Sequence, residues 1–124
     1  MGRDSQSNFF ITTIRQWGGT YTTVDKETHR GYIHFQEGNY TKAALTALKK
    51  LASTGKLALP ANFGEASYCS TPYKAYKSVM NIGSSAGVSN SVPNGDAFVS
   101  ACAPIPYHDE DHKFVISQGT NLAI

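Results

Sequence analysis

The sequence predicts a single α+β domain, built on an antiparallel sheet with two short helices. Three runs rich in aromatic and β-branched residues come first, a strongly amphipathic helix follows, and two further strand-like runs lie near the C-terminus. A chain of 124 residues is long enough to bury a hydrophobic core without metal or disulfide staples. We find no internal repeat and no domain boundary, and therefore expect one domain over residues 1–124.

The first third of the chain predicts a three-stranded meander. Residues 1–7 are polar, and we expect them to be frayed. Residues 8–15 (NFFITTIR) favour a strand, which the glycine pair at 18–19 then breaks. Residues 20–25 and 29–36 predict the next two strands, and apolar and polar side chains alternate along the second of them.

Residues 39–55 predict an amphipathic helix. Asn39 is a good N-cap residue, and Gly55 suits the position just after a helix. The apolar positions recur with helical spacing and form the stripe that we expect to be buried: Ala44, Leu45, Leu48, Leu51 and Ala52. The opposite face is polar and basic: Lys42, Thr46, Lys49, Lys50 and Ser53.

A second helix is predicted over residues 71–83. Thr71 can cap it, Pro72 fits the first helical position, and Gly83 ends it. Residues 83–95 (GSSAGVSNSVPNG) have no apolar periodicity, and their glycine and serine content predicts a flexible loop.

The C-terminal part predicts a strand pair. Residues 96–103 and 113–118 have strand-like composition and are separated by a proline-rich turn. Residues 120–124 are apolar enough for a short edge strand.

The charge is distributed unevenly, although the net charge is only +2. Residues 1–80 hold ten Lys and Arg against five acids, and residues 81–124 hold one Lys against four acids. We expect a basic face within residues 15–80, with tyrosines available for base stacking. The candidate binding residues are Arg15, Arg30, Tyr32, Lys42, Lys49, Lys50, Tyr73, Lys74 and Lys77.

These features favour a small, soluble, non-enzymatic binding protein whose partner is an anionic macromolecule, plausibly nucleic acid. Lysine contacts phosphate as a point charge, so we expect little sequence selectivity. The sequence has no window of 18 apolar residues and no hydrophobic run after Met1, so we expect neither a membrane span nor a signal peptide. No cofactor is expected.

The two cysteines support two alternative functions. Cys69 and Cys102 are not part of a CxxC pair, and they fit either free thiols or one disulfide. The low charged fraction of 16% and the many small polar residues fit a secreted or virion-type interaction protein with a Cys69–Cys102 disulfide, the second hypothesis. The third is a cysteine hydrolase, in which Cys69 is the nucleophile and His112 the base.

Two histidine sites complete the candidates. The turn at 108–112 (HDEDH) is the densest set of titratable groups, and it favours a solvated acidic turn over a metal site or a pH sensor. His34, on a predicted strand with Glu37 nearby, has the chemistry of a general base. A surface or structural role is the commoner one for such a histidine.

Overall fold

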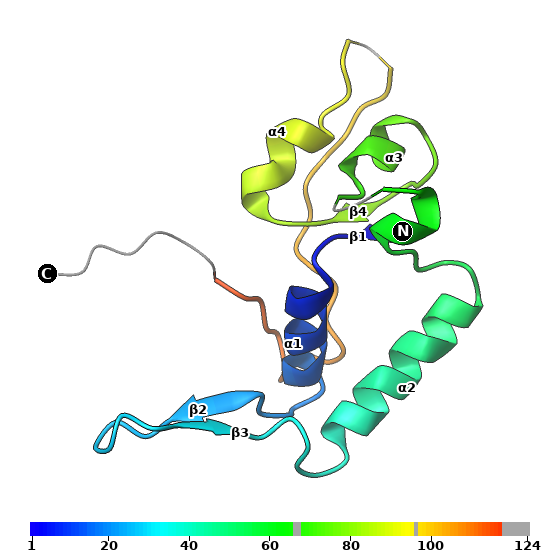
Figure 1. Cartoon of the computed structure of the whole chain (residues 1–124). Helices are drawn as coiled ribbons and strands as arrows, with labels where there is room; N and C mark the ends of the chain where they lie inside the picture. Colours follow the sequence, from blue (N-terminus) through cyan, green and yellow to red (C-terminus); the bar gives the residue numbers. More distant parts are fainter. Residues whose placement is uncertain (66–67, 96, 118–124) are drawn as a thin grey trace, which may run out of the picture.

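The computed structural model describes residues 1–65, 68–95 and 97–117, and it contains both helices and strands (Figure 1). The elements in chain order are β1 (Gly2–Arg3), α1 (Gln6–Gln16), β2 (Thr22–Val24), β3 (Gly31–Ile33), α2 (Tyr40–Ser53), η1 (Pro60–Phe63), α3 (Ser70–Lys74), β4 (Asn81–Ile82), η2 (Ser85–Gly87) and α4 (Val88–Ser91). Within the described residues, the strands form a parallel pair, β1–β4, and an antiparallel pair, β2–β3. The mixed composition agrees with the predicted class, but the three-stranded meander is not formed.

The strand predicted over residues 8–15 is wrong, because this segment lies in helix α1. The helix ends in a Schellman arrangement: the N–H of Gly18 donates to the carbonyl of Arg15, and that of Gly19 to the carbonyl of Ile14. Gly18 has a φ of +82°, which a residue with a side chain adopts only with strain. The glycine pair that we interpret as a strand breaker is therefore a helix terminator.

The next two predicted strands form a hairpin. β2 and β3 pair in antiparallel register, with Thr22 opposite Ile33. The turn is closed by the carboxylate of Asp25, which accepts hydrogen bonds from the N–H groups of Glu27 and Thr28 at 2.8 and 3.0 Å. These two bonds lower the pKa of Asp25 below its ordinary value.

The helix predicted over residues 39–55 is confirmed as α2. Asn39 occupies the N-cap position, although its side chain makes no capping bond, and Gly55 has a φ of +71° just after the helix. The predicted apolar stripe is only partly covered. Ala44 is fully buried against the rest of the molecule, whereas Leu45 and Leu51 remain 44% and 36% exposed.

The N-terminus is tied into the structure through a close backbone contact. β1 pairs in parallel with β4, with Gly2 opposite Asn81. A Cβ atom added at Gly2 would lie 2.6 Å from the Cβ of Cys69, so only glycine fits at this contact without movement. Residues 1–7, which we expect to be frayed, thus include strand β1 and the start of α1.

The second predicted helix is much shorter than residues 71–83. α3 ends at Lys74, and Tyr76 adopts a left-handed φ of +60° that helical residues do not have. The chain then enters β4. The predicted loop at 83–95 contains the short helices η2 and α4.

The predicted C-terminal strand pair is not formed in the described residues. Residues 97–103 and 113–117 are irregular, while Asp96, Gln118 and residues 120–124 lie outside the described part of the chain. Pairing requires a continuous ladder of backbone hydrogen bonds, and strand-like composition alone does not supply one.

The segment before the C-terminus packs on the end of α1. The side-chain amide of Gln16 donates to the carbonyls of Pro106 and Phe114, both at 3.0 Å. The ring of Trp17 stacks on that of His108, with 4.1 Å between centroids. These contacts bring the acidic turn beside the C-terminal end of α1.

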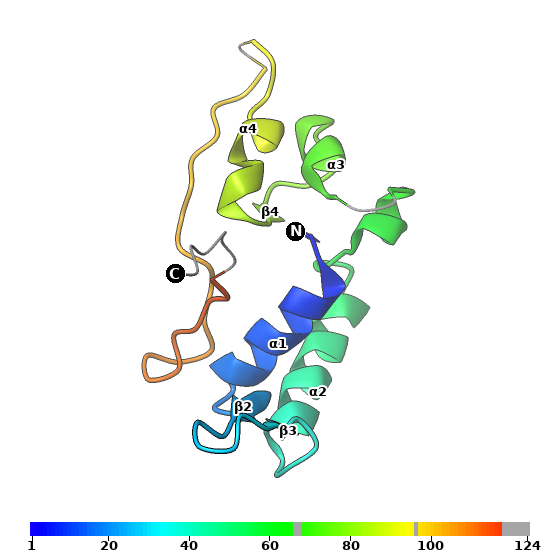
Figure 2. The ribbon, with the colours of Figure 1, turned by 60° about the vertical axis from the view of Figure 1, so that its left-hand side comes forward.

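The hydrophobic core is small, and the molecule is extended. Figure 2 shows α1 and α2 side by side in the lower part, with α3, α4 and β4 grouped above them. Among the described residues, the buried apolar side chains are Ile14, Ala44, Leu57, Pro60, Cys69 and Pro72. None of the helices in the described segments is both long and apolar enough to cross a membrane.

Candidate functional site

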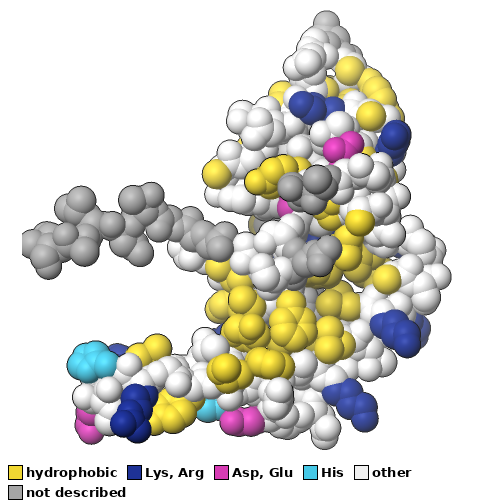
Figure 3. All heavy atoms as spheres, in the orientation of Figure 1, with side chains coloured by type: hydrophobic (Ala, Val, Ile, Leu, Met, Phe, Trp, Pro, Cys, Tyr) yellow, Lys and Arg dark blue, Asp and Glu magenta, His cyan; other side chains and the backbone are white. Residues whose placement is uncertain are grey.

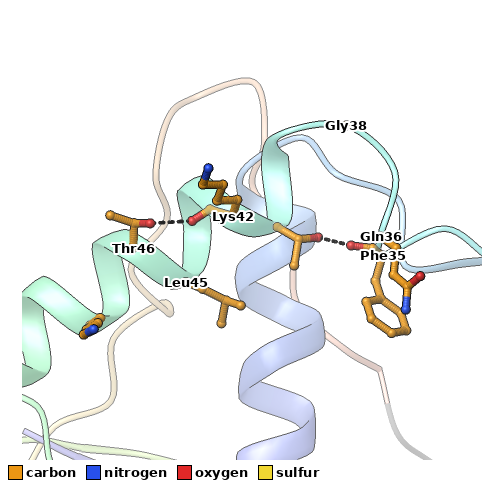
Figure 4. A pocket seen from close by; sticks show the side chains of 8 residues that line it. Phe35, Gln36, Gly38, Lys42, Leu45 and Thr46 are labelled. Carbon is orange, nitrogen blue, oxygen red and sulfur yellow. Dashed lines mark hydrogen bonds between the residues drawn. The ribbon is translucent and has the colours of Figure 1, made fainter.

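A surface hollow beside the N-terminal half of α2 is the first candidate site (Figure 4). It has a volume of about 420 Å³ and is open to solvent. Its lining comes from α2 and from the connection that leads into it: Phe35, Gln36, Gly38, Thr41, Lys42, Leu45, Thr46 and Lys49. We call it the lysine hollow. The hydroxyl of Thr41 donates to the carbonyl of Phe35 and so ties its two walls together.

The spacing along α2 explains the order of side chains around this hollow. Lys42, Leu45 and Lys49 follow one another at intervals of three and four residues, so they lie along one side of the helix. Both lysines are exposed, and neither has a carboxylate partner within the described residues. The hollow therefore combines an apolar surface with two unpaired positive charges.

Aromatic packing holds the floor of the lysine hollow in place. Phe35 stacks on Tyr21, with 5.6 Å between centroids, and meets Phe10 edge-on at 6.1 Å. Phe10 lies in α1 and Tyr21 just before β2. The cluster thus fixes the hairpin, and with it Phe35, against α1.

A second hollow adjoins the first, between α1 and the C-terminal half of α2. It has a volume of about 350 Å³ and is lined mainly by apolar side chains: Phe9, Phe10, Leu45, Leu48, Lys49, Ala52, Leu57, Leu59 and Asn62. We call it the leucine hollow. Leu45 and Lys49 line both hollows, so the two form a continuous surface along α2.

The structure does not gather the predicted binding residues on one face. Lys42, Lys49 and Lys50 lie on α2, whereas Lys74 and Lys77 lie at the end of α3 and beyond it, in the other half of the molecule (Figure 1). Figure 3 shows Lys and Arg side chains spread from the hairpin to the upper part of this face. The basic side chains of residues 15–80 therefore lie in separate patches and do not form the single basic face that the sequence predicts.

The remaining predicted binding residues make internal contacts or lie on the hairpin. The guanidinium of Arg15 lies 5.0 Å from the ring centre of Phe114, and Tyr73 meets Phe98 edge-on at 5.3 Å. Arg30 and Tyr32 are exposed on the hairpin. Tyr73 is thus occupied by packing, whereas Tyr32 is accessible.

The two cysteines are free thiols in the structure, so the proposed disulfide is not formed there. Cys69 is buried and Cys102 is exposed. Desolvation, reinforced by the nearby carboxylate of Asp4, raises the pKa of the Cys69 thiol. A raised pKa is the reverse of what a thiolate nucleophile needs.

The hydrolase pair of Cys69 and His112 is not assembled. Cys69 contacts Gly2 and Asp4, just before α1, and the ring of His112 lies beside Gly18, just after it. Helix α1 has 11 residues, so about 16 Å of helix separates the two. His112 instead bonds Asp109, with 2.7 Å between Nδ1 and Oδ1.

The acidic turn forms its own internal network. Partial desolvation raises the pKa of Asp109, but hydrogen bonds from His112 outweigh it, and the net pKa is lowered. Lys113 forms an ion pair with Glu110. Within the described ranges, no three His, Cys, Asp or Glu side chains are placed to hold a metal ion.

The structure brings Thr23, His34 and Glu37 together on the hairpin. The hydroxyl of Thr23 lies 2.7 Å from Nε2 of His34, whose Nδ1 lies 2.9 Å from the carboxylate of Glu37. Hydroxyl, imidazole and carboxylate in this order can activate a nucleophile. Here they lie on an exposed hairpin without walls to exclude water, and Thr23 and His34 are diagonal cross-strand neighbours. We therefore assign them to hairpin stability.

Comparison of the chain with protein-family models, with curated proteins and with solved structures finds no match.

Proposed function

We propose that the chain is a non-enzymatic binding protein that contacts single-stranded nucleic acid through the lysine hollow. The observation that carries this proposal is the pair Lys42 and Lys49, which have no carboxylate partner in the described residues and border an apolar floor. Lysine ammonium groups contact phosphates, and releasing the counterions of the nucleic acid drives such binding.

The apolar floor favours a single strand over a duplex. The bases of a single strand are unstacked and can enter a hollow that Phe35 and Leu45 line, while the backbone follows the lysines. In a duplex the base faces are stacked on one another and inaccessible, so a duplex would contact only the charged lysines. Because neither contact reads base edges, the proposed binding has little sequence selectivity.

Fluorescence anisotropy with a labelled single-stranded oligonucleotide tests the proposal. We expect binding at about 50 mM salt that weakens steeply as salt rises. Lys42→Ala and Lys49→Ala should each weaken binding several-fold and reduce the slope of log affinity against log salt by about one, because each removes one phosphate contact.

Lys26→Ala is the matched control, because Lys26 is an exposed lysine in the hairpin turn, away from the hollow. It should retain most of the affinity. The absence of binding at low salt would contradict the proposal, and so would equal losses in Lys26→Ala and the two hollow variants.

A second candidate function is that of a protein that assembles with other proteins. The observation that favours it is the apolar hollow between α1 and α2, together with the exposed Tyr40, Leu45 and Leu51 on α2, which single-stranded nucleic acid would cover only in part.

A further inference from the structure

The accessible surface of the chain is larger than that of a typical monomeric protein of the same mass. The accessible surface is 9263 Å², whereas a monomeric protein of 13.4 kDa exposes roughly 6,500 Å². The residues outside the described ranges, 66–67, 96 and 118–124, account for at most about 1,600 Å² of this difference even when fully exposed. More than about 1,000 Å² of excess surface therefore belongs to the described residues.

This excess is spread over the described residues as a whole, and it is larger than the surface that one partner of an interface loses. A stable protein–protein interface buries about 800 Å² on each partner. Many large apolar side chains are exposed, and those on α2 include Tyr40, Leu45 and Leu51. Figure 3 shows hydrophobic side chains gathered in the middle of the molecule, over the region of α1 and α2.

The leucine hollow and the exposed side chain of Leu51 offer the two parts that a two-fold contact needs, a hollow and a ridge. Leu48 and Ala52 line the hollow, whereas Leu51 does not line it. Leu51 follows Leu48 by three residues and, at 36% exposure, forms a ridge on α2. In a two-fold dimer, the same patch meets itself, so the ridge of one copy can enter the hollow of the other. Lys49 lines the hollow with its apolar stem while its charge stays in water.

We propose that the leucine hollow and the Leu51 ridge form the contact surface for a second copy of this chain. The area left uncovered is sufficient for one side of a stable dimer, and the patch supplies both halves of a two-fold contact. The net charge of +2 is too small to oppose the approach of two copies. The stripe along α2 that the fold leaves partly open is then completed by the partner copy.

This inference does not depend on the proposed nucleic-acid binding. Dimerisation is tested at Leu51, which lines neither hollow, and is measured as mass without nucleic acid, whereas binding is tested at Lys42 and Lys49 and is measured with an oligonucleotide. Lys49 borders both hollows, so the dimer test leaves both lysines unchanged. A dimer that binds no oligonucleotide would contradict only the proposed function, and a monomer that binds would contradict only the dimer.

Sedimentation velocity on the full chain without nucleic acid, over a concentration series, tests the dimer. We expect the unmodified chain to reach twice its mass of 13.4 kDa. Leu51→Glu should return it to the mass of a single chain, because a carboxylate would be buried without a partner at the contact. Since Leu51 is partly exposed on the single chain, this change leaves the fold of one copy intact, which far-UV circular dichroism checks.

Val99→Glu is the matched control, because Val99 is 99% exposed and lies far from α2 in the sequence. It should keep the dimer mass. Should Leu51→Glu lose its helical signal, the smaller change Leu51→Ser takes its place, with the same expectation. A single-chain mass for the unmodified protein at every concentration would overturn the proposal, and so would an undiminished dimer in a folded Leu51 variant.

Discussion

The interpretation of Cys69 changes once its surroundings in the structure are known. In the sequence it precedes a predicted helix, where a thiol could be activated. In the structure it is buried, its N–H donates to Asp4 at 2.6 Å, and its side chain packs against Gly2. The site holds the N-terminus in place, and its residues do not form a nucleophilic centre.

We therefore predict that Cys69 reacts slowly with iodoacetamide. Its raised pKa keeps the thiol protonated at neutral pH, and burial excludes the reagent. In the Cys102→Ser variant, labelling of Cys69 near pH 8 should be at least roughly tenfold slower than labelling of Cys102 in the Cys69→Ser variant. Denaturant should abolish the difference. Labelling of Cys69 below pH 7 at the rate of Cys102 would show a reactive thiolate instead. The readout is mass spectrometry.

At the residue scale, the sequence predicts which side chains are charged and exposed better than it predicts which side chains contact one another. Lys42 and Lys49 are foreseen as exposed lysines on one helix, and they border the lysine hollow. Phe35 is not foreseen as part of the site, because its position depends on packing against Phe10 and Tyr21. No sequence pattern records a contact of that kind.

At the scale of elements, α2 is predictable and α1 is not. Residues 39–55 carry a helical apolar period, a capping residue and a terminal glycine that all agree. In residues 8–15, the β-branched and aromatic composition favours a strand, but packing of the fully buried Ile14 favours the helix. The glycines at 18 and 19 fit both interpretations, and only the Schellman bonds distinguish them.

The termination of α1 gives a prediction at this scale. Gly18→Ala should destabilise the fold by about 1–2 kcal/mol, because φ is +82° there and a Cβ would lie 2.9 Å from Nε2 of His112. Gly31→Ala is the control, since a Cβ at Gly31 meets nothing within 4 Å. Urea unfolding followed by circular dichroism measures both. Equal midpoints for the two variants would contradict the helix end described here.

The C-terminal strand pair fails for a reason that also belongs to this scale. Composition selects residues that suit a strand, but each strand needs a neighbour whose backbone groups are free. Residues 97–103 and 113–117 have no such pairing in the structure, and the Gln16 bonds to Pro106 and Phe114 hold the second run near α1 instead.

At the scale of the whole molecule, the small core and the large accessible surface both indicate that apolar side chains of α2 are left uncovered by the rest of the chain. The sequence indicates a chain long enough for a core, but it does not indicate that Leu45 and Leu51 stay exposed, because that depends on which elements pack on α2. A second copy on the leucine hollow would cover this surface, and the part of the lysine hollow around Phe35 and Lys42 would stay open to an anionic partner.

The urea midpoint of the unmodified chain, measured at two protein concentrations about a hundredfold apart, tests this account most directly. For a chain that folds as a dimer, association contributes about 2.7 kcal/mol more stability at the higher concentration. The midpoint should therefore rise with concentration, by on the order of 1 M urea. A midpoint that does not change with concentration would show that the exposed apolar surface of α2 is not covered by a second copy.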